Sequence, residues 1–312
     1  MARSGSYAAA SVLGSALYDP AAAATKATDA LLAMTALDTT NLRVTFTAPA
    51  SGSVYARLLL THKGSGTLPA TLLGILDGAT VKARGAPRIT VRAAGVTTLF
   101  QHEGVFLVTG LTPGQSYTWD AAYGVEVAVA STAFGWGGPN NNTANDAYGA
   151  ASFEVWDAPD LLAGAFYDPA AAVAKSCAAA IAMTALDTTN LRLTFQAPAS
   201  GRVLAQLRCI DSGSAASSPC SYLLGVLDGA TVKLRAMPLG YLTQPGTLAV
   251  SDHCVRELLG VVAGLTPGQS YTWDAAYGVE FPTAGSAIRY GGPDDATTDN
   301  AYGGFAFMIW AA

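Results

Sequence analysis

Residues 33–52 read AMTALDTTNLRVTFTAPASG, and residues 182–201 repeat them as AMTALDTTNLRLTFQAPASG, with 18 of 20 positions identical. Residues 110–126 and residues 264–280 both read GLTPGQSYTWDAAYGVE. Corresponding residues lie 149 to 154 positions apart, so a unit of about 140 residues is duplicated once. A unit of this size can bury its own core, and the repeat therefore predicts two tandem domains.

The predicted boundaries follow the ends of the two copies. They are an N-terminal arm over 1–17, a first domain over 18–157, a short linker over 158–166 and a second domain over 167–312.

Strand signals dominate each unit. Apolar residues alternate with polar ones in NLRVTFT (41–47), which is the period of a half-buried strand. Asp77-Gly78 lies between two apolar runs and predicts a β-hairpin. The Ala-rich stretch 21–33 is the one place where a brief helical turn is expected. About eight strands per unit predict an all-β chain of two tandem antiparallel sandwiches or barrels.

Several short motifs in this order are shared with a known fold family. They are FxAPxxGxVxxxL, an LDGxxV hairpin, GLTPGQSYTW and a final YGGFAFMIW strand. This pattern resembles the C1q/TNF-like jelly roll over most of each repeat. It also resembles repeat domains encoded in phage and prophage genomes of high-GC bacteria. The resemblance implies jelly-roll domains, assembly into a homo-oligomer with a trimer favoured, and a role as a binding head or virion component. The strand after Tyr123 and Tyr277 is more apolar than in that class.

The composition narrows the classes of function. Charged residues make up 12% of the 312 residues, against roughly 25% in a usual soluble domain, and the net charge is −5. Disorder and binding to nucleic acid are therefore not expected. Neither a membrane-spanning helix nor a signal peptide is expected. A surface poor in charge suits burial against other chains, and high-GC codon usage would give the same composition.

No constellation of catalytic groups is evident. The three histidines have no ligand-like spacing, and nucleophile-elbow, Walker and dinucleotide motifs are absent. The chain is therefore expected not to be an enzyme. The four cysteines, all in the second domain, are expected to be buried or, for Cys209 and Cys220, to form a disulfide across a loop.

The loops GGPNNNTANDAYG (137–149) and GGPDDATTDNAYG (291–303) gather oxygen-bearing side chains. A solvated turn is one interpretation. A second is a Ca²⁺ site, the one cofactor considered, for which the ligands would be Asp294, Asp295 and Asp299. A third is contact with a glycan or a protein partner, for which the candidates are Asn140, Asn141, Asn142, Asn145, Asp146 and Asn300.

Retained aromatic and acidic residues have structural explanations. Trp119 and Trp273, with their neighbouring tyrosines, are expected in the core, although stacking on sugar rings is an alternative. Two pairs of acids also recur. Asp120/Asp274 and Glu126/Glu280 are expected to form salt bridges with Arg43/Arg192 or Arg84/Arg235.

The expected function is that of a non-enzymatic virion structural protein of a tailed bacteriophage, assembled in the host cytoplasm. A capsid decoration or minor capsid surface protein would contact copies of itself and other virion proteins, such as the major capsid protein. The alternative is a receptor-binding or tail-fibre adhesin module that recognises a glycan of the host surface. An enzyme would require a polar cleft that the sequence does not reveal.

Overall fold

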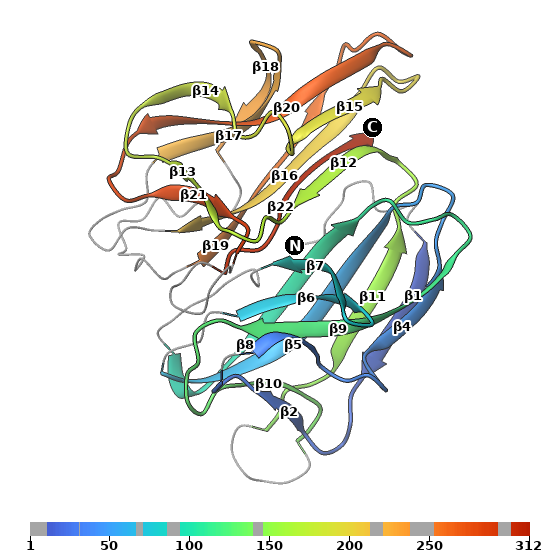
Figure 1. Ribbon diagram of the computed structural model, residues 1–312, viewed down its shortest axis with the longest axis vertical. Helices are drawn as coiled ribbons and strands as arrows, with labels where there is room; N and C mark the ends of the chain where they lie inside the picture. Colours follow the sequence, from blue (N-terminus) through green and yellow to red (C-terminus); the bar gives the residue numbers. More distant parts are fainter. Residues whose placement is uncertain are drawn as a thin grey trace.

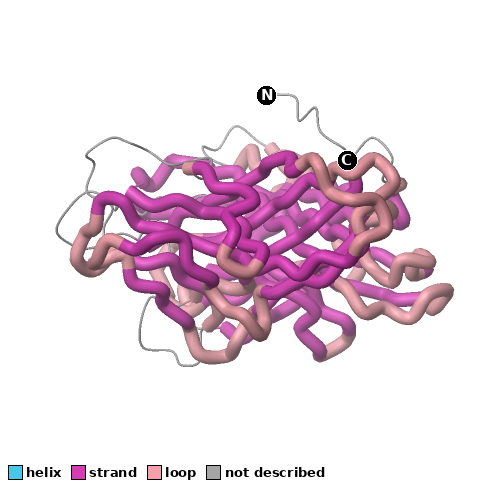
Figure 2. Tube along the Cα trace, turned by 90° about the horizontal axis from the view of Figure 1, so that it is seen from above, coloured by secondary structure: helices cyan, strands magenta, loops and turns pink. Residues whose placement is uncertain are grey.

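A computed structural model describes most of the chain. The described residues are 11–30, 32–66, 71–85, 94–139, 146–212, 221–237, 253–292 and 301–312. Strands and loops make up this part of the chain, without a helix (Figure 2). None of its segments is a helix long and apolar enough to span a membrane. The fold is all-β, as the alternating pattern predicts.

Each repeat forms its own set of strands, and each strand has a counterpart eleven strands later (Figure 1). The first repeat contains β1 (Val12–Tyr18), β2 (Ala24–Ala27), β3 (Leu32–Ala36), β4 (Arg43–Thr47), β5 (Val54–Gly66), β6 (Thr71–Asp77), β7 (Thr80–Gly85), β8 (Ala94–Val108), β9 (Ser116–Val125), β10 (Ala133–Trp136) and β11 (Ala151–Asp157). The second contains β12 (Leu161–Tyr167), β13 (Val173–Ser176), β14 (Ile181–Ala185), β15 (Arg192–Gln196), β16 (Val203–Ser212), β17 (Ser221–Asp228), β18 (Thr231–Ala236), β19 (His253–Val262), β20 (Ser270–Phe281), β21 (Ala287–Tyr290) and β22 (Phe305–Ala311).

The first repeat is a sandwich of two antiparallel sheets. Strands β10 and β11 follow one another along one edge of β5, and β8 pairs with the other edge. Strands β1 and β2 extend this sheet beyond β11 and β10. The second sheet runs from β3 and β4 through β9 and β6 to β7. Three pairs of consecutive strands each form one interrupted strand: β1 with β2, β3 with β4, and β10 with β11. Counted in this way, each repeat has eight strands in chain order, and their order is 1-8-3-6 in one sheet and 2-7-4-5 in the other. This is the strand order of a jelly roll.

The second repeat has the same order, with β12, β22, β16 and β19 in one sheet and β15, β20, β17 and β18 in the other. The chain is therefore a pair of tandem antiparallel β-sandwiches. The segments at the predicted boundaries are strands too. Strand β1 lies largely within the predicted arm, and β12 overlaps the predicted linker.

The Ala-rich stretch 21–33 is not helical. Strand β2 lies within it, and β3 begins at its end. Both are short edge elements, paired with β10 and β9. Pairing with a neighbouring strand has overridden the helix preference of alanine, which is only a weak bias. The predicted Asp77-Gly78 hairpin joins β6 to β7, and Gly78 adopts a φ of 59° that favours glycine.

Each sandwich encloses a separate core. In β4 the buried residues Val44 and Phe46 alternate with exposed neighbours, as the period-2 pattern predicts. Trp119 of β9 is fully buried, and its ring meets Phe46 edge-on at 4.7 Å between centroids. The second core has the same pair, Phe195 and Trp273, at 4.8 Å. Duplication has kept this centre of the core unchanged.

Replacing either tryptophan should therefore have the same effect. We expect Trp119→Ala and Trp273→Ala each to lower the free energy of unfolding by about 3–5 kcal/mol, because each leaves a large cavity. Urea unfolding of the full chain measures both losses. The half-buried Tyr117 is the control, and Tyr117→Ala should cost less. A loss of less than 1 kcal/mol for one tryptophan alone would show that the two cores are not equivalent.

Candidate functional site

The two sandwiches meet in an apolar cluster. Tyr55 and Leu107 of the first domain pack with Met308 and Trp310 of the second, and all four are buried. The rings of Tyr55 and Trp310 are stacked, with 5.2 Å between centroids. The Tyr55 hydroxyl donates a hydrogen bond to Oε1 of Gln206 at 3.2 Å. The cluster joins β5 and β8 of one sandwich to β16 and β22 of the other.

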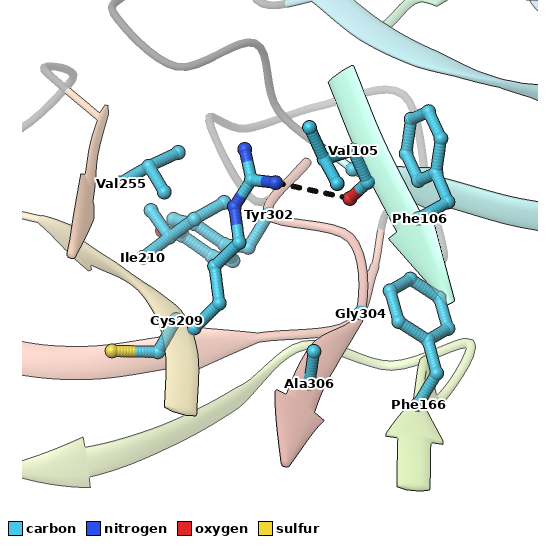
Figure 3. A pocket seen from close by; sticks show the side chains of 11 residues that line it. Val105, Phe106, Phe166, Cys209, Ile210, Val255, Tyr302, Gly304 and Ala306 are labelled. Atoms are coloured by element: carbon cyan, nitrogen blue, oxygen red, sulfur yellow. Dashed lines mark hydrogen bonds between the residues drawn. The ribbon is translucent and has the colours of Figure 1, made fainter. Parts of the chain in front are cut away.

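An ion pair and a backbone contact flank this cluster. Nε of Arg84, in β7, lies 2.8 Å from Oδ2 of Asp168, which follows β12. Burial raises the pKa of Asp168, against the lowering effect of its hydrogen bond to Arg84. Arg208 of β16 donates through its guanidinium to the carbonyl of Val105, at 3.0 Å (Figure 3). Charged groups therefore fix the orientation in which the domains meet.

Backbone groups of the second domain complete the contact. The amide of Ala301 donates to Oε2 of the buried Glu126 at 2.7 Å, and the amide of Gly304 donates to the carbonyl of Arg84 at 3.0 Å. Gly85 and Gly303 form an antiparallel bridge. A Cβ atom on Gly303 would overlap the Cα of Gly85, and Gly303 has a φ of 69°. This approach therefore requires glycine at position 303.

A small pocket lies at the same junction (Figure 3). Its volume is about 20 Å³, which accommodates roughly one water molecule. The side chains around it are mainly apolar and include Phe106, Phe166, Ile210 and Tyr302. Small-molecule sites have volumes of several hundred Å³ and several convergent polar groups. The pocket at the junction is therefore much smaller than a typical small-molecule site.

Most of the predicted loop site lies outside the described residues. This applies to Asn140, Asn141, Asn142, Asn145, Asp294, Asp295, Asp299 and Asn300. Asp146 is described and half-buried, and its charge adds to the effect of burial in raising the pKa of Tyr148. Within the described residues, no group of three or more histidine, cysteine or acidic side chains is placed to hold a metal ion. The calcium and glycan interpretations of these loops stay predictions.

Two of the four retained acids have the predicted partners. Nε of Arg43 lies 2.7 Å from Asp120, and Nε of Arg192 lies 2.7 Å from Asp274. The prediction was wrong for Arg84, which pairs with Asp168 of the other domain. The sequence carries a signal for this pair that was overlooked, because both of its residues recur, as Arg235 and Asp19.

The aromatic residues divide between core and junction. Trp119 and Trp273 are fully buried, as the core interpretation predicts, and no sugar ring can stack on them. Trp310 instead covers the contact between the domains. Among the cysteines, Cys177 and Cys209 are buried as predicted, and Cys220 lies outside the described residues.

Two histidines lie in the first core. The rings of His62 (β5) and His102 (β8) are 5.2 Å apart, and both side chains are buried. Burial lowers the pKa of His102 to about 4. Burial, and secondarily the charge of His102, lowers the pKa of His62 well below its usual value. Both imidazoles are therefore neutral at pH 7.

The histidine pair predicts a loss of stability in acid. An unfolded histidine titrates near 6.5, so between pH 6.5 and about 4 the unfolded chain binds more protons than the folded one. The free energy of unfolding should be fully retained above pH 7 and fall by about 3 kcal/mol through this window for His102 alone. Urea unfolding at pH 7 and pH 4.5 measures it. His102→Leu should flatten the dependence, and an unchanged slope would contradict the assignment.

The two equivalent glycines provide a matched test of the contact. Gly303 and Gly149 have φ angles of 69° and 72°, but a Cβ on Gly149 would meet nothing within 4 Å. Both Gly→Ala variants should lose about 1–2 kcal/mol from backbone strain. Gly303→Ala should lose a further 1–3 kcal/mol, roughly, because it overlaps Gly85. Calorimetry measures both, and equal losses would show that the approach at Gly303 is not tight.

Comparisons with known proteins leave the family open. No protein-family model matches the chain, and no curated protein matches it. Among solved structures, PNGase F, a glycosylasparaginase from Flavobacterium meningosepticum, is similar at 12% identity and a TM-score of 0.38, over 93% of this chain and 96% of that one. The CBM22-1–CBM22-2 tandem domain of Paenibacillus barcinonensis Xyn10C is similar at 11% identity and a TM-score of 0.22, over 98% and 96%. Likenesses this weak carry no argument about function.

Proposed function

We propose that this chain is a non-enzymatic structural protein that acts by assembly, as a decoration or minor surface protein on the capsid of a tailed bacteriophage. The observation that carries the proposal is the contact between the repeats. Two jelly-roll domains pack directly on one another through apolar side chains, a half-buried ion pair and close backbone approach. The same kinds of contact hold protein subunits together.

The surface and the resemblance support the same conclusion. With 12% charged residues, the chain relies on small and uncharged side chains over much of its exterior. Such a surface is suited to burial against other subunits. The resemblance to C1q/TNF-like and phage-encoded repeat domains is the reason for proposing a phage capsid as the particle. In this role the protein would stabilise the capsid by burying surface against copies of itself and the major capsid protein.

Electron microscopy of a phage lysate tests the proposal. Antibodies raised against the purified chain are used to label particles from a host that carries its gene. Particles prepared after deletion of that gene are the control. Regular labelling of the heads is the expected result. Labelling at the tail end would overturn decoration in favour of receptor binding. Absence of label from every particle would overturn the virion role altogether.

A further inference from the structure

The contact between the repeats joins two different surfaces of two copies of one fold. We define the edge surface of the first domain as Arg84, Val105, Leu107 and Glu126. We define the face surface of the second domain as Leu161, Phe166, Asp168, Ala301 and Gly303. Because the contact is heterologous, each domain also carries a copy of the other surface, and most of that copy lies outside the contact. The exceptions are Leu204 and Trp156, the counterparts of Tyr55 and Trp310, which pack against the contact within the chain.

The second domain carries the unused edge surface. By the repeat offsets, its residues are Arg235, Leu259, Val261 and Glu280. Leu107 is 2% exposed in the contact, whereas its counterpart Val261 is 48% exposed and Leu259 is 46% exposed. Glu126 is buried, and its counterpart Glu280 is exposed. The second domain therefore exposes, at these four positions, side chains whose counterparts in the first domain are buried or half-buried.

The first domain carries the unused face surface. Its residues are Val12, Leu17, Asp19, Ala147 and Gly149. Leu17, the counterpart of Phe166, is 74% exposed and Val12 is 47% exposed. Asp19, Ala147 and Gly149 are exposed as well. Exposed large apolar side chains thus occur at matching positions of both unused surfaces.

The charges on the two unused surfaces are complementary. Arg84 and Asp168 form the half-buried ion pair of the contact, and their counterparts are Arg235 and Asp19. Neither counterpart has an ion-pair partner in the part of the chain that the structure describes. The amide of Ala301 donates to the carboxylate of Glu126, and the counterparts of these two groups are the amide of Ala147 and the carboxylate of Glu280.

The unused face is more polar at its centre than the used one. Met308 and Ala306 of the second domain correspond to Glu154 and Ser152 of the first. Glu154 lies 3.7 Å from a guanidinium nitrogen of Arg57. A contact on this face would bury less apolar surface than the contact within the chain, and should be the weaker of the two.

We propose that a second copy of this chain occupies the unused face surface with its own unused edge surface. The contact repeats between copies the arrangement that the chain forms between its own domains, with Arg235 of one copy paired with Asp19 of the next. A heterologous contact of this kind closes into a ring when the rotation between units allows it. The partner in the proposed assembly role is thus a second copy of the chain. The proposed contact depends on the proposed function only for its biological setting.

The size of the purified full chain in solution tests the proposal. Light scattering across a concentration series should show an oligomer that forms as concentration rises. The double variant Leu259→Glu/Val261→Glu should weaken association at least about tenfold, because it places charge in a contact that needs apolar surface. A wild-type chain that stays monomeric at the highest concentration would overturn the proposal, as would a double variant that associates normally.

The control lies in the same domain. Val232 is 40% exposed, and its counterpart Val81 remains 43% exposed beside the contact that is formed. Position 232 is therefore outside the proposed surface, and Val232→Glu should associate like the wild type. Circular dichroism of all variants checks that each is folded. A loss of association in Val232→Glu equal to that of the double variant would contradict the assignment of the surface.

A charge exchange tests the pairing of the two surfaces. Arg235→Glu and Asp19→Arg alone should each weaken association about tenfold, since each places like charges together. The chain that carries both should recover wild-type association, because the pair is restored with its signs reversed. Failure of the combined variant to recover, when each single variant is weakened, would overturn the proposed pairing.

The two proposals fail in different ways. Self-association is measured without phage particles. A monomeric chain that nevertheless labels phage heads would overturn this contact and leave the capsid role standing. An oligomer that shows the expected variant effects but labels no particle would leave the contact standing and overturn the capsid role.

Discussion

The packing of Tyr55 and Leu107 against Met308 and Trp310 determines which surfaces of the two domains stay exposed. It turns two sandwiches, each with its own core, into one body with a defined orientation. Arg84 and Asp168 reinforce that orientation through a half-buried ion pair with 2.8 Å between Nε and Oδ2. Only the parts of each domain that this contact leaves exposed are available to a partner.

Divergence between the repeats is uneven. Core segments and several contact positions, such as Arg84/Arg235 and Asp168/Asp19, are the same in both copies, whereas other positions near the contact differ. The GLTPGQSYTWDAAYGVE segment, which supplies the core tryptophan, is identical in both copies. Near the contact, Ala83 and Phe106 of the first domain correspond to Leu234 and Gly260 of the second. A Cβ on Gly260 would lie 2.8 Å from the Leu234 side chain. A large and a small residue have exchanged places, which keeps the volume between the strands.

Much of the fold could be predicted from the sequence because it depends on local patterns. Alternation in NLRVTFT and the Asp77-Gly78 turn locate β4 and the β6–β7 hairpin, and they do so in both repeats. In β2, β3 and β10, four or five residues that include one or two alanines leave too short a pattern to identify a strand, and the pairing partners of β2 and β3 lie far away in the sequence. The contact between the domains was not predicted at all. It depends on which surfaces two finished sandwiches bring together, and only the recurrence of Arg84 and Asp168 as Arg235 and Asp19 points to it.

The short connection between β11 and β12 has a consequence for the order in which contacts form. Asp157 ends one strand and Leu161 begins the next, so the two domains are held a few residues apart. Short tethers give local concentrations in roughly the millimolar range. The joint between the domains therefore closes at any cellular abundance of the protein, whereas a matching joint between separate chains responds to how much protein has been made. Duplication within one chain has therefore made one copy of this contact permanent and left the other dependent on protein concentration.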